Sequence, residues 1–209
     1  MKSLNKPNKP KKKPLENIKI GYALTGSFCT FAASKVACEA LVEAGASVTP
    51  IFSYNAASMN TRFGNAKTHM EQFERICGNP PIATIENAEP IGPKEMFDIV
   101  VVAPCTGNTA AKLALGITDT PVTMAVKSHI RNNRPVLIAM STNDALSAAA
   151  KNIGILLNYR NYYFVPLSQN DTAGKPRSCV ADFSQMVQSV NDALSGKQSQ
   201  PLIFFNETD

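Results

Sequence analysis

Short runs of consecutive apolar residues alternate along this chain with longer stretches in which apolar residues recur every three or four positions. A run bounded by turn residues predicts a buried strand, and the wider spacing predicts an amphipathic helix. The clearest strand is the segment DIVVVAP at 98–104, which is apolar after its first residue. Other strands are predicted at 18–24, 47–53, 134–140 and 162–166, with a short one at 82–85.

Helices are predicted in the intervals between these strands. In residues 29–45, Phe31, Val36 and Leu41 recur at roughly helical spacing, and Gly45 is a typical helix stop. Further helices are predicted up to about 76 and at 108–115, 121–132, 143–158 and 181–194. This alternation predicts an α/β fold, with a mostly parallel sheet that carries helices on both faces.

Charge is concentrated at the start of the chain. The formal net charge of the 209 residues is +5, but residues 1–15 hold six of the lysines and no acid, so the rest is near neutral. We therefore predict a disordered basic tail at 1–16, one domain at 17–196 and a C-terminal extension at 197–209. The tail is either a tether to an anionic surface or a solvated leader. The neutral body argues against nucleic-acid binding.

The cysteines and histidines exclude several kinds of site. The five cysteines are odd in number and none forms CxxC, which favours free thiols in a reducing cytoplasm. His69 and His129 are too few and too isolated to predict a metal site. No apolar run is long enough to span a membrane, and no apolar segment follows the basic start as in a signal peptide.

Polar side chains cluster directly after four of the predicted strands. Right-handed crossovers bring these strand ends to one edge of the sheet, where open α/β sheets bind ligands. Each cluster could cap a helix, but a cap uses one residue and several are present, so a shared ligand crevice is favoured. No dinucleotide fingerprint, P-loop or Ser-His-Asp set names the ligand. The candidates are Gly26, Ser27, Ser53, Thr106, Asn108, Thr109, Ser141, Thr142 and Asn143.

Cys105 follows the clearest strand and could be a nucleophile, a redox thiol or a small residue in a turn. No histidine or lysine in its local sequence would lower the pKa of the thiol, although a helix N-terminus could do so modestly. We therefore predict that Cys105 keeps the turn compact while its polar neighbours face the ligand.

Several segments resemble a known family. The segment APCTGNTAAKLALGITD at 103–119 resembles the signature of the homo-oligomeric flavin-containing cysteine decarboxylases. That block continued to 144, together with AEPIGP at 88–93 and NYYFVPLSQNDTAGKPRS at 161–178, resembles in order one branch of this family, the B subunits of dipicolinate synthases. The resemblance covers about residues 17–195.

The resemblance implies a three-layer α/β/α sandwich of the Rossmann-like or flavodoxin-like kind, assembled as a trimer or larger. It implies that Pro104 and the nine candidates above line an FMN-type site. It also implies a partner, a dehydrogenase-like A subunit that carries NAD(P). The implied activity is the formation of dipicolinate (pyridine-2,6-dicarboxylate) from a dihydrodipicolinate-type precursor, in the cytoplasm of the mother cell of a sporulating bacterium.

The chain also departs from the decarboxylases. They carry a histidine just before the central strand, whereas residues 88–98 here contain none. Their methionine-and-asparagine substrate loop is replaced by AMSTND at 139–144. Oxidative decarboxylation of a cysteine-containing substrate is therefore not expected, and the crevice holds either FMN or the planar dicarboxylate precursor.

A dicarboxylate needs cationic partners, and arginine binds carboxylates best through two parallel hydrogen bonds. The candidates are Arg62, Lys175 and Arg177, each of which could instead be a solvated loop charge. Three functions stay open: the B subunit of a two-chain synthase, an independent FMN flavoprotein, and a non-catalytic oligomeric scaffold for the A subunit.

Overall fold

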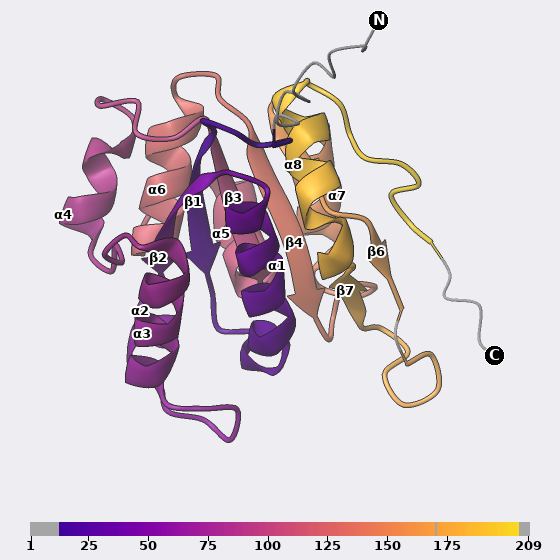
Figure 1. Ribbon diagram of the computed structural model, residues 1–209. Helices are drawn as coiled ribbons and strands as arrows, with labels where there is room; N and C mark the ends of the chain where they lie inside the picture. The colour runs from indigo at the N-terminus through magenta and orange to yellow at the C-terminus, as the bar shows by residue number, and fades with distance from the viewer. Residues whose placement is uncertain (1–12, 170, 205–209) are drawn as a thin grey trace, which may run out of the picture.

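A seven-stranded sheet forms the centre of the protein in the computed structural model, which describes residues 13–169 and 171–204 (Figure 1). Its five parallel strands lie in the order β2-β1-β3-β4-β5. Their bounds are Lys19–Leu24 (β1), Ser47–Phe52 (β2), Ile99–Cys105 (β3), Val136–Thr142 (β4) and Tyr162–Phe164 (β5). Strand β3 is buried at every residue because both of its faces are covered, as its unbroken apolar sequence predicts.

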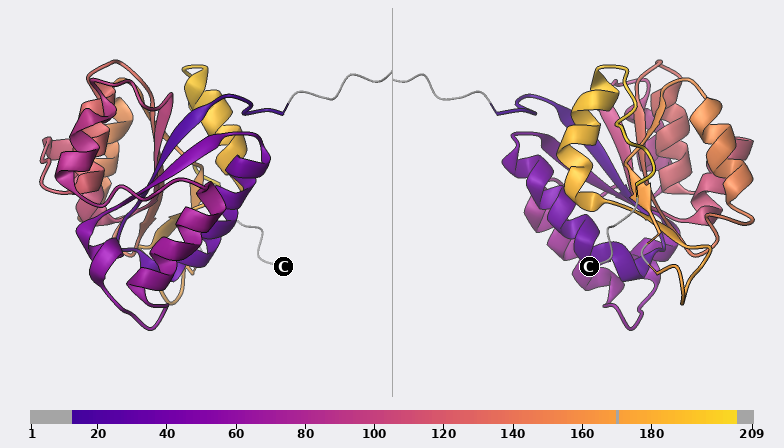
Figure 2. Two further views of the ribbon diagram at one scale, coloured as in Figure 1. Left: turned by 60° about the vertical axis from the view of Figure 1, so that its left-hand side comes forward. Right: turned by 90° about the vertical axis from the view of Figure 1, so that its right-hand side faces the viewer.

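Helices cover the sheet on both sides and make the three-layer sandwich (Figure 2). One buried apolar cluster includes α1, α3 and α8, and a second, on the opposite face, includes α5, α6 and α7. The helices are Phe31–Glu43 (α1), Tyr54–Ser58 (α2), Ala66–Cys77 (α3), Ile85–Ala88 (α4), Gly107–Leu115 (α5), Pro121–Ile130 (α6), Ala150–Asn158 (α7) and Met186–Leu194 (α8). The predicted α/β class, the mostly parallel sheet and the helical layers are confirmed.

Side-chain caps determine where the helices beside the strand ends begin. The Thr106 hydroxyl accepts a hydrogen bond from the Thr109 N–H at 3.1 Å and starts α5 directly after β3. Thr120 and Thr123 form a reciprocal capping box at the start of α6. Because each cap is local in sequence, the beginning of α5 follows from the residues themselves.

One predicted helix begins later than expected, and one predicted strand does not form. Residues 143–149 form turns, so α7 begins at Ala150, since the Leu146 N–H donates to the Arg177 carbonyl instead of continuing a helix. The strand predicted at 82–85 is reduced to a single bridge between Ile82 and Ile51, and α4 begins at Ile85.

An antiparallel hairpin beside β4 was not predicted. It consists of β6 (Leu167–Ser168) and β7 (Cys179–Ala181), and β7 pairs with the last two residues of β4. The predicted strand at 162–166 is therefore not the last strand of the sheet.

The chain segments that flank the expected domain pack against it. Leu15 is fully buried, and its N–H donates to the Ala44 carbonyl at 2.9 Å. After α8, the Gln198 side chain binds both the N–H and the carbonyl of Phe164. Residues 1–12 of the expected tail and 205–209 of the expected extension lie outside the described residues.

Candidate ligand-binding crevice

Two adjoining cavities open at the carboxyl ends of β1, β2 and β3. The strand order places β2 on one side of β1 and β3 on the other, so successive crossovers leave in opposite directions and a crevice forms between β1 and β3. The first cavity has a volume of about 330 Å³ and the second about 410 Å³. Gly26 and Thr106 line both cavities and form the boundary between them.

Thr25 ties the loop after β1 to the loop after β3. Its hydroxyl donates to the Pro104 carbonyl at 2.7 Å and accepts from the Thr106 N–H at 3.0 Å. Thr25 is buried and both of its bonds are used, so it holds the two walls of the crevice in one position.

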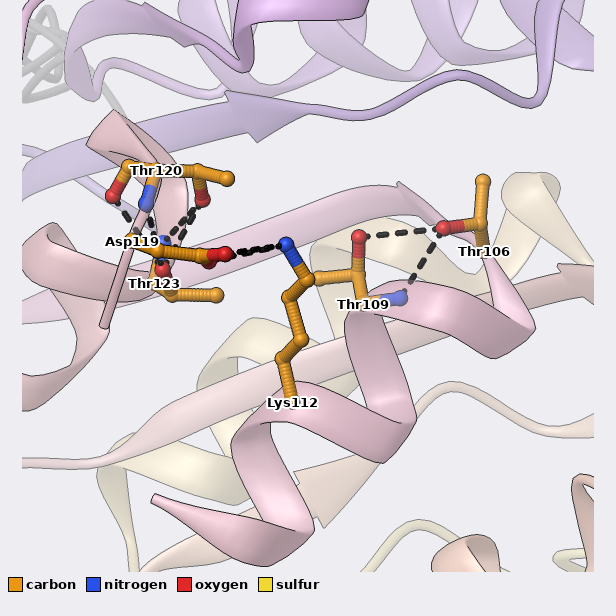
Figure 3. A network of polar contacts seen from close by, with 6 residues as sticks. All are labelled: Thr106, Thr109, Lys112, Asp119, Thr120 and Thr123. Atoms are coloured by element: carbon orange, nitrogen blue, oxygen red, sulfur yellow. Dashed lines mark hydrogen bonds and ion pairs between the residues drawn. The ribbon is translucent and has the colours of Figure 1, made fainter. Parts of the chain in front are cut away.

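Threonines and one ion pair line part of the first cavity, and Figure 3 shows the contacts that these residues make. Lys112 of α5 donates to both carboxylate oxygens of Asp119 at 2.8 Å. This bond lowers the pKa of the Asp119 carboxyl below its usual value. The pair connects α5 to the residue before the Thr120 cap. The positive charge of Lys112 is balanced by the Asp119 carboxylate, so it is not free to bind another anion.

A chain of hydroxyl groups lines the second cavity. Ser27 and Ser141 share a hydrogen bond of 2.7 Å, and the Thr30 hydroxyl donates to Ser141 at 3.1 Å. The Thr142 hydroxyl donates to the carboxylate of Asp144, which lines neither cavity. The second cavity therefore offers neutral hydrogen-bonding groups from β4 and from the turns that follow β1 and β4.

The structure brings most of the predicted residues together. Gly26, Ser53, Thr106, Asn108 and Thr109 line the first cavity. The second is lined by Gly26, Ser27, Thr106, Ser141, Thr142, Asn143 and Lys175, among others.

Three predicted residues lie outside both linings. Pro104 is buried, and its carbonyl accepts the Thr25 hydrogen bond. Arg62 is exposed, with its guanidinium 4.8 Å from the ring centre of Phe63. Arg177 is exposed, and its carbonyl holds the Leu146 N–H.

Sequence reasoning missed several lining residues. Thr25 looks like the end of a strand, and nothing local marks it as a connector between loops. Lys112 and Asp119 stand inside the segment that carries the family resemblance, so their spacing could have pointed to a pair. The other lining residues that were missed are Cys29, Thr30, Tyr54, Asn55, Thr120, Ser178 and Val180.

Cys105 does not line either cavity. Its side chain is fully buried, and burial raises the pKa of the thiol to about 12. A thiol that stays protonated at neutral pH is a poor nucleophile, so the geometry supports a packing role.

Neither histidine lies in the crevice. The ring of His69 packs edge-on against Phe31 between α1 and α3, and its Nε2 is buried without a hydrogen-bond partner among the described residues. His129 is buried in α6, where burial lowers the pKa of the ring to about 4 and its Nε2 bonds the Pro135 carbonyl at 3.1 Å. In residues 13–169 and 171–204, no three His, Cys, Asp or Glu side chains gather as a metal site would require.

The model of the flavoprotein family matches residues 8–194, which is most of the chain. The chain belongs to the flavoprotein family. It is 43% identical over 192 residues to the dipicolinate synthase B chain of Bacillus subtilis strain 168, covering 92% of this chain and 96% of that one. Its similarity within the family is therefore to the dipicolinate synthase B subunits, over nearly the full length of both chains.

Solved structures agree with this assignment. The crystal structure of the dipicolinate synthase B chain from Bacillus halodurans C superposes with a TM-score of 0.84 at 37% identity, covering 91% of this chain and 97% of that one. The FMN-dependent cysteine decarboxylase SpaF shares the fold, with a TM-score of 0.63 at 19% identity over 87% of this chain and 97% of that one. No helix among the described residues has the length and apolar character needed to cross a membrane.

Proposed function

We propose that this chain is the B subunit of a dipicolinate synthase and acts with a dehydrogenase-like A subunit that carries NAD(P). Together they oxidise a dihydrodipicolinate-type precursor to dipicolinate in the mother-cell cytoplasm of a sporulating bacterium. The observation that carries this proposal is the 43% identity to such a protein across 92% of the chain. The lack of a dinucleotide fingerprint in this sequence suits a division of labour between the two subunits.

In this proposal the second cavity binds and orients the precursor. The hydroxyls of Ser27, Thr30 and Ser141 can donate to a carboxylate or accept from a ring N–H. Lys175 supplies the positive charge, because it lines this cavity and forms no ion pair within the described residues. The precursor ring loses a hydride to the nucleotide on the A subunit and a proton to solvent, and this chain contributes by holding the ring in place.

FMN is the alternative ligand of the crevice. The first cavity fits a ribityl phosphate in its donor chemistry, because the hydroxyls of Thr106, Thr109 and Thr120 line it together with the N-terminal end of α5. Ser27, Ser141 and Thr142 of the second cavity would then face the ring system. FMN would supply two-electron redox chemistry when bound. The proposed assembly holds three or more copies of the chain, as the family resemblance implies.

Co-expression tests the proposal. The A subunit alone should give little dipicolinate, and addition of this chain should restore output. Asn143→Ala, in the second cavity, should lower that output at least several-fold, while Asn87→Ala on α4, exposed and outside both cavities, serves as the matched control. Full output from the A subunit alone would contradict the proposal.

Two further results separate the alternatives. Unchanged output from Asn108→Ala and Asn143→Ala, with an intact complex, would instead support a scaffold. Flavin absorbance in the purified protein, or uptake of added FMN that the Asn108→Ala variant loses, would support an FMN flavoprotein.

A further inference from the structure

Two cysteines from different helices meet on the face of the sheet covered by α1, α3 and α8. Cys38 lies in the second half of α1, and Cys77 is the last residue of α3. Their sulfur atoms are 3.6 Å apart, and this is the one thiol–thiol hydrogen bond among the described residues. The two residues are 39 positions apart in the chain, so the contact depends on the packing of α1 against α3.

The two thiols differ in accessibility. Cys38 is fully buried, whereas Cys77 is half-buried at the end of a helix. The hydrogen bond with Cys77, followed by burial, raises the pKa of the Cys38 thiol well above its usual value. An oxidant from solvent therefore reaches Cys77 first.

Cys77 stands directly before the turn that ends α3. Gly78 ends α3 in the left-handed conformation, with a φ of 67°, and no atom lies within 4 Å of the position that a Cβ there would take. Asn79 then anchors the chain, since its side-chain amide donates to the Val48 carbonyl at 2.7 Å. The sulfurs lie 3.6 Å apart and must approach to a bonding distance near 2.05 Å for a disulfide to form.

We propose that Cys38 and Cys77 form a dithiol that is oxidised to an intramolecular disulfide, which fastens α1 to α3. The Cys77 thiolate attacks a small external disulfide, forms a mixed disulfide and releases one thiol. Once Cys77 is in the mixed disulfide, the thiol–thiol hydrogen bond, which is the largest cause of the raised pKa of Cys38, is gone. The Cys38 thiol then loses its proton as its sulfur attacks the Cys77 sulfur and displaces the second thiol. The two cysteines lose two electrons to the external disulfide, and their two protons end on the released thiols.

This modification goes beyond the proposed function and is independent of it. Neither cysteine lines a cavity of the crevice. The disulfide closes a loop of 39 residues, which restricts the unfolded chain. Oxidation should therefore raise the melting temperature by about 5–10 °C without changing ligand binding.

The experiment uses the full chain, reduced, desalted and incubated with oxidised glutathione at about pH 8. After acid quenching, the protein is unfolded in denaturant and labelled with maleimide near pH 7, and the intact mass should show only the three other cysteines modified by glutathione or maleimide. Peptide mapping should show a link between Cys38 and Cys77 that dithiothreitol removes. The oxidised protein should also melt at the higher temperature given above.

Two variants serve as controls. Cys77→Ser should abolish both the link and the thermal shift, and Cys29→Ser, which removes an exposed cysteine, should retain them. Circular dichroism confirms that each variant is folded. The proposal is overturned if oxidised glutathione modifies Cys29 while Cys38 and Cys77 both remain free thiols. It is also overturned if Cys77 keeps a bound glutathione without reacting further, or if a disulfide joins a different pair of cysteines.

Discussion

Single hydroxyl groups at the crevice cap helices and line cavities at the same time. Thr106 accepts from the Thr109 N–H to start α5, and it also lines both cavities. Ser53 likewise caps α2 through the Ala56 N–H at 3.3 Å and lines the first cavity. Capping and ligand binding are therefore compatible roles for one residue, and a polar turn after a strand can serve both.

Thr106→Ala should show both roles. Loss of the cap should lower the free energy of unfolding by about 1 kcal/mol, measured by urea denaturation. Loss of the lining hydroxyl should also weaken binding of pyridine-2,6-dicarboxylate several-fold in calorimetric titration. Thr84→Ala, which removes the equivalent cap of α4, should lower stability only, because Thr84 lies outside both cavities. Equal affinities for the two variants would contradict a ligand role for Thr106.

Alkylation should distinguish Cys105 from an accessible thiol. Because the pKa of Cys105 is raised to about 12, its thiolate is scarce at pH 8, and burial also blocks the reagent. Iodoacetamide at pH 8 should label the exposed Cys29 and leave Cys105 unmodified, as measured by peptide mass spectrometry. Labelling of Cys105 at a rate similar to that of Cys29 would show that the thiol is reactive after all.

Helices and strands could be predicted from the sequence where neighbouring residues alone determine them. Strand β3 follows from an unbroken apolar run, and α5 and α6 follow from their caps. The turns at 143–149 and the hairpin β6–β7 were not predictable. The strands of the hairpin have two or three residues, too few to show a periodicity, and long-range bonds from Arg177 and Val180 define the conformation of both segments.

The buried histidine of α6 makes stability depend on pH. In the unfolded chain histidine has a pKa of about 6.5, and in the folded protein burial lowers the pKa of His129 to about 4. Below pH 6.5 the unfolded chain therefore binds a proton that the folded protein does not, and stability falls as the pH drops through this window.

Urea denaturation at pH 7.5 and pH 5 measures this effect. Stability at pH 5 should be lower by about 2 kcal/mol through His129 alone. His129→Gln, which keeps an N–H donor for the Pro135 carbonyl, should lose that part of the pH dependence. Parallel pH profiles for the two proteins would rule out His129 as the source.

At the scale of the whole molecule, the position of the crevice was predictable and its cations were not. Parallel strands must end at one edge, so the polar turns after β1, β2, β3 and β4 could be assigned together. Of the three predicted cations, only Lys175 lines a cavity. Loop cations depend on tertiary folding, because no periodicity or cap in the sequence restricts where their loops go.

The packed domain starts before the first strand, because Leu15 is fully buried. Substitution of Leu15 tests whether this burial stabilises the fold. Leu15→Ala should lower the free energy of unfolding by about 2–4 kcal/mol, because it removes a fully buried side chain from the cluster under α1. Leu115→Ala, at a leucine that is 69% exposed, should change it by less than about 0.5 kcal/mol. Similar values for the two variants in urea denaturation would show that Leu15 does not stabilise the fold.

The two outermost parallel strands have a further consequence for assembly. On β2, Pro50 has no N–H to donate. The Ile82 N–H donates to the Pro50 carbonyl, and the Phe52 N–H donates to the Ile82 carbonyl. On β5, the Gln198 amide occupies both backbone groups of Phe164. Because these groups are already satisfied, a neighbouring molecule has little free backbone to pair with at these strands, which disfavours edge-to-edge aggregation. Copies of the chain that associate must therefore meet mainly through helices and loops.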